Sequence, residues 1–91
     1  MDEARVNRAR FRAWRRGFRE ADLILGPFAD SRVSGMSEAE MALFEDLLDQ
    51  PDHDVYDWIT GAAPAPARFD GELIRALRAI RPSDLPIGDL T

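Results

Sequence analysis

Residues 37–48, with the sequence SEAEMALFEDLL, carry the pattern that decides the fold class. Ser37 and Glu40 fit a capping box, because a serine hydroxyl and a glutamate carboxylate three residues apart can each accept a hydrogen bond from a backbone amide at a helix start. Apolar residues then recur at helical spacing, namely Met41, Phe44 and Leu48, with Leu47 at the edge of that face. The stretch predicts a short amphipathic helix that ends near Leu48.

A helix is also predicted at the start of the chain. It runs from about Glu3 to Arg16 and stops at Gly17, because glycine readily takes the left-handed conformation of a helix C-cap. Its predicted core-facing residues are Phe11, Trp14 and Phe18, with Val6, Ala9 and Ala13 alongside. Its predicted solvent-facing residues are Arg5, Arg8, Arg12, Arg15 and Arg19. We therefore expect an amphipathic helix with a basic outer face.

The second predicted helix begins at Arg19 and meets a break at Gly26-Pro27. Proline removes a backbone donor and clashes with the preceding turn, so this pair is expected to end or kink the helix. The helix would then finish at Leu25 or Asp30, and residues 31–35 would form a loop.

A fourth helix is predicted to start at Pro51, with Asp52 or Asp54 as its N-cap, and to end at Gly61. Its apolar side consists of Val55, Trp58 and Ile59. Residues 62–68, which include two prolines, predict a stiff extended connector. Helical spacing returns from Phe69 to Arg81, with Leu73, Leu77 and Ile80 on one face, and Pro82 stops it.

Length and composition agree with this helical pattern. The 91 residues are 45% hydrophobic and 32% charged, which is typical of a globular domain. We expect an all-α fold, a compact bundle of four to five short helices over residues 1–81, followed by a flexible tail over residues 82–91. A chain of this size buries only about 60–65% of its unfolded surface, which leaves little room for a deep cleft beside the core and argues against a stand-alone enzyme.

Searches for catalytic or metal-binding patterns find none. The chain has no cysteine, one histidine (His53) and six glycines scattered singly, which excludes a disulfide, a thiolate nucleophile and a glycine-rich phosphate loop. The acids between Glu45 and Asp57 lack the spacing of a calcium loop, so we interpret them as helix caps and a solvated face, with His53 exposed. No apolar run is long enough for a membrane span. We expect no catalytic residue, no metal and no membrane insertion.

Charge is distributed steeply along the chain, although the net charge is only −5. Residues 1–19 hold seven of the twelve basic residues, all of them arginine, whereas residues 20–72 hold thirteen acids. An arginine-rich helix raises the possibility of nucleic-acid binding. The sequence pI near 4.7, with no helix-turn-helix pattern and no aromatic stacking platform, argues against it.

The most specific motif is Arg16-Gly17-x-x-Glu20, followed by residues 22–30, DLILGPFAD. Taken alone, Arg16 and Glu20 could form an i, i+4 ion pair and Gly17 could be a cap. Together with the following residues, the motif closely resembles the FAD assembly factor family, which is SdhE-like and is also called succinate dehydrogenase assembly factor 2. A second stretch, DHDVYDWITG over residues 52–61, resembles the second signature of that family. The resemblance covers roughly residues 8 to 80.

The resemblance implies a non-catalytic assembly factor with a small helical-bundle fold. Members bind the flavoprotein subunit of succinate dehydrogenase, and in some cases of fumarate reductase, and promote covalent attachment of FAD to a histidine of that subunit. The residues implied in flavoprotein binding are Arg16, Gly17 and Glu20, with their neighbours Arg15, Arg19 and Asp22. The second signature contributes Asp54, Tyr56 and Trp58, and we expect Trp58 to lie in the core with its indole N–H hydrogen-bonded.

We expect FAD to stay with the flavoprotein, so that this chain binds no cofactor stably and is a monomer when free. Because the resemblance begins close to Met1, a bacterial cytoplasm is expected. Two alternatives remain from the residues alone. The chain could be a helical adaptor that binds another protein through its arginine-rich corner, or a nucleic-acid-binding protein.

Overall fold

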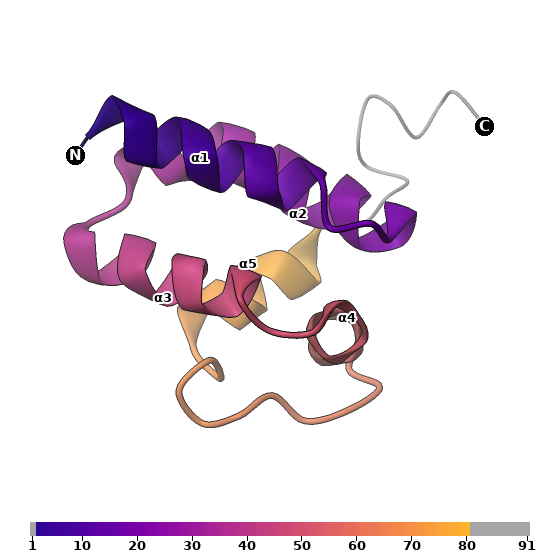
Figure 1. Ribbon diagram of the computed structural model, residues 1–91. Helices are drawn as coiled ribbons and strands as arrows, with labels where there is room; N and C mark the ends of the chain where they lie inside the picture. Colours follow the sequence, from indigo (N-terminus) through magenta and orange to yellow (C-terminus); the bar gives the residue numbers. More distant parts are fainter. Residues whose placement is uncertain (1, 81–91) are drawn as a thin grey trace.

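Five α-helices and one short 3₁₀ helix follow one another in the computed structural model, which describes residues 2–80 (Figure 1). Their bounds are α1 Glu3–Trp14, α2 Arg19–Arg32, η1 Val33–Gly35, α3 Glu38–Leu48, α4 Asp52–Thr60 and α5 Glu72–Ala79. No strand occurs within these residues, so the all-α prediction is confirmed. The tail predicted for residues 82–91 lies outside the described range.

The capping box predicted at the start of α3 is present. The backbone N–H of Glu40 donates to Ser37 Oγ at 3.1 Å, and the backbone N–H of Ser37 donates to Glu40 Oε1 at 2.8 Å. The bond from the Ser37 backbone N–H favours the charged carboxylate and holds the pKa of Glu40 below its usual value. The helix then buries Met41, Phe44 and Leu48 as predicted, and it also fully buries Leu47, which was predicted at the edge of that face.

The second helix does not end before Gly26-Pro27, which corrects the earlier of its two predicted ends, at Leu25; the later one, Asp30, lies two residues before the end observed. α2 continues through Pro27 to Arg32. A proline inside a helix costs about 3 kcal/mol, but buried apolar residues flank it on both sides, and each of them that is larger than alanine contributes about 1.5–3 kcal/mol. These residues are Ile24, Leu25, Phe28 and Ala29. Burial therefore outweighs the loss of one backbone hydrogen bond.

The predicted loop over residues 31–35 is also wrong. Ser31 and Arg32 complete α2, and η1 follows at once, with the Val33 side chain fully buried. Only Met36 and Ser37 separate η1 from α3. Residues 31–35 are mostly polar or small, but the buried Val33 holds them against the core.

α1 and α2 lie side by side (Figure 1), and they pack closely at one point. The indole ring of Trp14 lies directly over Gly26: a Cβ on Gly26 would be 2.2 Å from Trp14 Cδ2. Trp14 Nε1 donates to Asp30 Oδ2 at 3.0 Å. Gly26 is therefore required for close approach of the two helices, which also explains why a glycine is tolerated in the middle of α2.

The basic face of α1 is not simply solvent-facing, and this corrects a third prediction. Arg5 hydrogen-bonds the carboxylates of Glu38 and Glu45, and Arg12 pairs with Asp49. α1 thus turns basic residues toward the acidic residues of the α3 region. Phe11, which was predicted to face the core, is 60% exposed, because the residues of α1 that enter the core are the smaller Val6, Ala9 and Ala13.

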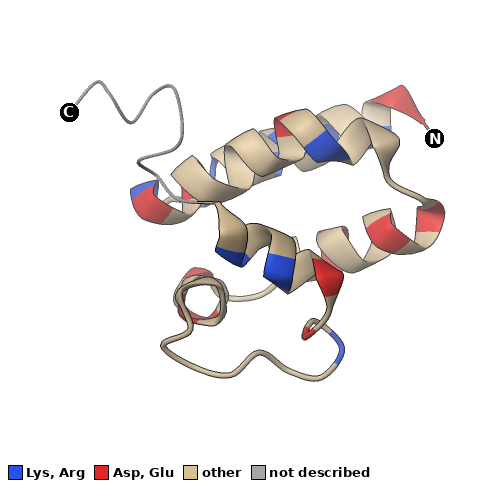
Figure 2. Ribbon diagram, turned by 180° about the vertical axis from the view of Figure 1, so that it is seen from behind, with Lys and Arg blue, Asp and Glu red and all other residues tan. Residues whose placement is uncertain are grey.

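The C-terminal part covers the opposite side of the core. α5 begins at Glu72 and not at Phe69 as predicted. Phe69 lies in the preceding turn and is almost fully buried, stacked on Trp58 with 5.6 Å between ring centroids. Arg78 of α5 donates through Nε to the Trp58 carbonyl at 2.9 Å, which joins α5 to α4. Figure 2 shows basic positions on α5 and acidic positions on α3.

Candidate functional site

The α1–α2 corner, defined here as residues 15–20, is an exposed turn that requires a glycine. α1 ends at Trp14, two residues earlier than predicted, and Gly17 has φ +84°, a conformation that other residues rarely adopt. No atom lies within 4 Å of the position that a Cβ on Gly17 would take. The side chains of Arg15, Arg19 and Glu20 are exposed around it. The corner thus presents bare backbone and three charged side chains to solvent.

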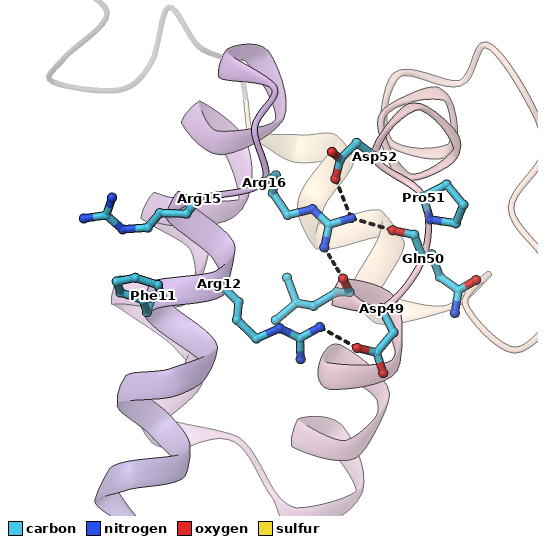
Figure 3. Close-up of a pocket in the computed structure, with 9 residues that line it drawn as sticks. Phe11, Arg12, Arg15, Arg16, Asp49, Gln50, Pro51 and Asp52 are labelled. Atoms are coloured by element: carbon cyan, nitrogen blue, oxygen red, sulfur yellow. Dashed lines mark hydrogen bonds and ion pairs between the residues drawn. The ribbon is translucent and has the colours of Figure 1, made fainter.

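Arg16 points the other way, into the protein. Its side chain is only 6% exposed and reaches the connection between α3 and α4 (Figure 3). The guanidinium donates to the carbonyl oxygen of Leu48 and to that of Gln50, the latter at 2.6 Å, and it pairs with Asp52 Oδ1 at 2.8 Å. Arg16 therefore fixes the corner to the α3–α4 connection, and an ion pair between Arg16 and Glu20 does not form.

Asp22 is likewise turned toward the corner. Its Oδ1 accepts a hydrogen bond from the backbone N–H of Arg16 at 2.8 Å. The carboxylate lies in the first turn of α2, where the helix dipole favours negative charge. Asp22 thereby holds the turn around Gly17 in one conformation.

The pairing of Arg16 with Asp52 changes how α4 begins. The N-cap is Pro51 and makes no side-chain capping bond, so neither Asp52 nor Asp54 serves as N-cap. A guanidinium offers a carboxylate a charge-assisted hydrogen bond, which is stronger than a bond from a neutral amide. The Asp52 carboxylate therefore joins α4 to the α1–α2 corner and does not cap its own helix.

The two sequence signatures meet at Phe18. Its ring contacts His53 edge-on, with 5.0 Å between centroids, and lies 4.9 Å from the ring of Tyr56. His53 is exposed as predicted, and Tyr56 is half-buried. This cluster places the first half of α4 beside the α1–α2 corner, although more than 30 residues separate them in the sequence.

The remaining members of the second signature lie elsewhere. Asp54 is exposed in the first turn of α4. Trp58 is half-buried against the core, and its indole N–H has no hydrogen-bond partner among residues 2–80, unlike the prediction. Its stacking on Phe69 supports a structural role for Trp58 in joining α4 to the turn before α5.

An open groove of about 450 Å³ lies next to the corner, between the end of α1 and the α3–α4 connection (Figure 3). It is lined by Phe11, Arg12, Arg15, Arg16, Leu48, Asp49, Gln50, Pro51 and Asp52. Sequence reasoning missed this groove. Arg16 bonds main-chain carbonyls 32 and 34 residues away, and no side-chain pattern marks a carbonyl as a partner.

Two other kinds of site were sought among residues 2–80. No group of three or more histidine or acidic side chains converges as a metal site would require. None of the helices described combines the length and the apolar character needed to cross a bilayer.

Comparison with known proteins agrees with the signatures. The family described as flavinator of succinate dehydrogenase matches residues 7–81. "FAD assembly factor SdhE" of Acetobacter pasteurianus is 32% identical over 74 residues, which cover 81% of this chain and 68% of the relative. "Succinate dehydrogenase assembly factor 2, mitochondrial" of Mycosarcoma maydis is 37% identical over 67 residues, covering 74% of this chain and 28% of the relative.

A protein of the same name from Debaryomyces hansenii is 38% identical over 77 residues, which are 79% of this chain and 54% of the relative. The chain thus spans roughly a quarter to a half of the length of these two fungal relatives. No solved structure matches it. With a family match that extends over both signatures and from the middle of α1 to the end of α5, the chain belongs to the flavinator of succinate dehydrogenase family.

Proposed function

We propose that this chain is an assembly factor that binds the flavoprotein subunit of succinate dehydrogenase and promotes covalent attachment of FAD to it. Membership of the family supports this activity. The observation that carries the proposal is the exposed turn at Gly17, where an Arg-Gly-x-x-Glu motif presents bare backbone to solvent. A partner surface can approach such a turn more closely than any position that carries a side chain.

The motif divides into an outward and an inward set of residues. Arg15, Gly17, Arg19 and Glu20 are exposed, so we assign them to contact with the flavoprotein. Arg16 and Asp22 are positioning residues, because their hydrogen bonds hold the corner and the α3–α4 connection in place. Arg16 thus contributes to flavoprotein binding through the shape of the corner.

The flavoprotein supplies FAD and the histidine to which it is attached. This chain supplies no bond-forming group in the proposal. It binds the conformation of the flavoprotein in which cofactor and histidine are aligned, and thereby raises the population of that conformation. The open surroundings of Gly17 support a docking role and not an enclosed cofactor site.

Several finer points belong to the same proposal. We propose that the protein is non-catalytic, holds no FAD stably, is monomeric when free, and acts in a bacterial cytoplasm, with fumarate reductase flavoprotein as a second partner. Nucleic acid is not proposed as a ligand. Arg5, Arg12 and Arg16 are already paired with carboxylates, which leaves fewer cations for phosphates.

The experiment is co-expression with the flavoprotein subunit, followed by flavin fluorescence of the denatured subunit. Gly17→Arg should abolish the covalent flavin, because the side chain holds the partner away. Gly61→Arg is the matched control, since Gly61 has φ +85° and equally open surroundings but caps the end of α4. The proposal fails if Gly17→Arg leaves covalent flavin at the wild-type level, or if both variants lose it equally.

A further inference from the structure

We propose that the groove lined by Phe11, Arg15 and the α3–α4 connection, here called the Phe11 groove, is a second docking point for the flavoprotein. Its occupant is a segment of that subunit in which an acidic side chain lies next to an apolar one. The inference rests on the proposed function and extends it from the turn at Gly17 to a neighbouring surface whose apolar anchor, Phe11, lies outside both sequence signatures.

The apolar part of the groove is Phe11. Its side chain is 60% exposed, and it is the one large hydrophobic residue among residues 2–80 that is exposed to this degree. A single exposed aromatic ring at the edge of a groove is typical of an interface anchor, because aromatic residues and arginine dominate binding energy when they become buried. The Phe11 ring is not part of the hydrophobic core.

The charged part is Arg15. Its guanidinium lies over the Phe11 ring, 4.6 Å from the centroid. Arg12 and Arg16 are paired with Asp49 and Asp52, whereas Arg15 has no ion pair within the described part of the chain. Stacking on the ring orients the planar guanidinium and leaves its N–H groups available, so a carboxylate is the ligand that it fits.

The opposite wall is held rigidly. Arg16 fixes Leu48, Gln50 and Asp52 through its hydrogen bonds and ion pair. Figure 3 shows Arg12 and Arg16 turned toward the α3–α4 connection, while Phe11 and Arg15 project from the end of α1 in another direction. A preformed wall of this kind lowers the cost of ordering the site on binding.

The groove is shared with the α1–α2 corner through Arg15 and Arg16. It is open and lined mainly by polar and charged residues, whereas small-molecule sites are enclosed and mainly apolar. A polypeptide segment that also touches the corner therefore fits it better than a small ligand does. The positive charge of Arg15 favours an acidic side chain in that segment, and the Phe11 ring favours an apolar residue next to it.

The test is the dissociation constant between the full chain and the purified, non-covalently loaded flavoprotein subunit at several salt concentrations. Phe11→Ser and Arg15→Ser should each weaken binding about 10-fold, as expected for interface anchors. Of these two variants, only Arg15→Ser should also make the dissociation constant less dependent on salt, since Phe11→Ser leaves the charge unchanged. Arg8→Ser, another exposed arginine of α1 that does not line the groove, is the control and should bind within about 2-fold of the wild type.

The outcomes separate the two proposals. If the wild type binds and Phe11→Ser and Arg15→Ser bind equally well, the Phe11 groove is not a docking point and Arg15 is not a contact residue, whereas docking through the turn at Gly17 stands. If Arg8→Ser weakens binding as much as Arg15→Ser, the loss of any positive charge on α1 explains the weaker binding, and the inference is overturned. If the wild type does not bind the flavoprotein at all, both proposals fail. Circular dichroism of each variant verifies that these surface changes leave the fold intact.

Discussion

The carboxylate of Asp22 accepts a hydrogen bond from the backbone N–H of Arg16, with 2.8 Å between the two atoms. This bond runs from the first turn of α2 back to the residue before Gly17, and so it closes the turn on itself. The Arg16 side chain then ties the same turn to the carbonyl oxygens of Leu48 and Gln50. One backbone amide and one guanidinium therefore determine how the corner is presented to a partner.

Replacement of Asp22 by asparagine should lower the free energy of unfolding by about 1 kcal/mol, because a charged acceptor near a helix N-terminus becomes a neutral one. Urea denaturation followed by circular dichroism measures the change. Asp54→Asn is the matched control, since Asp54 occupies the first turn of α4 but accepts no side-chain hydrogen bond among residues 2–80. Equal destabilisation by the two variants would mean that the helix dipole alone accounts for the effect.

Replacement of Arg16 by lysine should destabilise the fold by about 1.5–3 kcal/mol, because an ammonium group keeps the charge for Asp52 but cannot match the planar fork that serves two carbonyls. The buried position of Arg16 makes this loss larger than for a surface pair. Arg19→Lys, at an exposed site in the same corner, should change stability by less than about 0.5 kcal/mol.

The Arg16→Lys variant also tests whether Arg16 positions the corner or contacts the flavoprotein directly. If Arg16 acts by holding the corner, Arg16→Lys should lower covalent flavin formation at 37 °C and recover part of it at a lower growth temperature, where the fold is better populated. A variant of wild-type stability that still forms no covalent flavin would instead place Arg16 in direct contact with the flavoprotein.

Much of the fold follows from local patterns in the sequence. The capping box at Ser37 and the apolar spacing of α3 predicted that helix almost to the residue, because caps and periodicity are properties of a few neighbouring residues. The earlier predicted end of α2, at Leu25, was wrong for the opposite reason: burial of residues on both sides of Pro27 is a property of the whole bundle. The basic face of α1 was misread in the same way, since its acidic partners lie on another helix.

The candidate site was predictable in its residues but not in its geometry. The motif around Gly17 predicted a turn, and the left-handed backbone there is what a glycine at a helix end indicates. The inward direction of the Arg16 side chain could not be predicted, because its partners are mainly main-chain carbonyls. Phe11 was assigned to the core from its spacing, and only the packing of the helices leaves it exposed.

Replacement of Gly26 by alanine should destabilise the protein, although alanine is the better helix former by about 1 kcal/mol. The added Cβ would lie 2.2 Å from Trp14 Cδ2, so the indole must move, at a cost of about 1–3 kcal/mol. Tryptophan fluorescence and thermal unfolding measure the two consequences. Gly35→Ala, at an exposed position with nothing within 4 Å, is the control and should leave both unchanged. A rise in melting temperature with Gly26→Ala would contradict the close packing of α1 on α2.

Stability should decrease in acid partly through Glu45. Its hydrogen bonds to Arg5 hold the pKa of the folded-state carboxylate below its usual value near 4.3. A lowered folded pKa means that the unfolded chain takes up the proton first. The stabilisation is therefore complete above about pH 5 and is lost as the pH falls through the folded pKa.

Arg5→Gln removes the main cause of this shift, because Arg5 bonds Glu45 at 2.7 and 3.0 Å. The variant should be less stable than the wild type at pH 7, and the difference should shrink as the pH falls below about 5 and through the folded-state pKa of Glu45, which lies below the unfolded value. Urea denaturation at a series of pH values measures it. Arg75→Gln, which removes an exposed arginine of α5 without touching Glu45, should give a difference that does not vary over this range. If the Arg5→Gln difference is equally large at pH 3 and pH 7, the contribution of Arg5 is packing of its side chain and not its charge on Glu45.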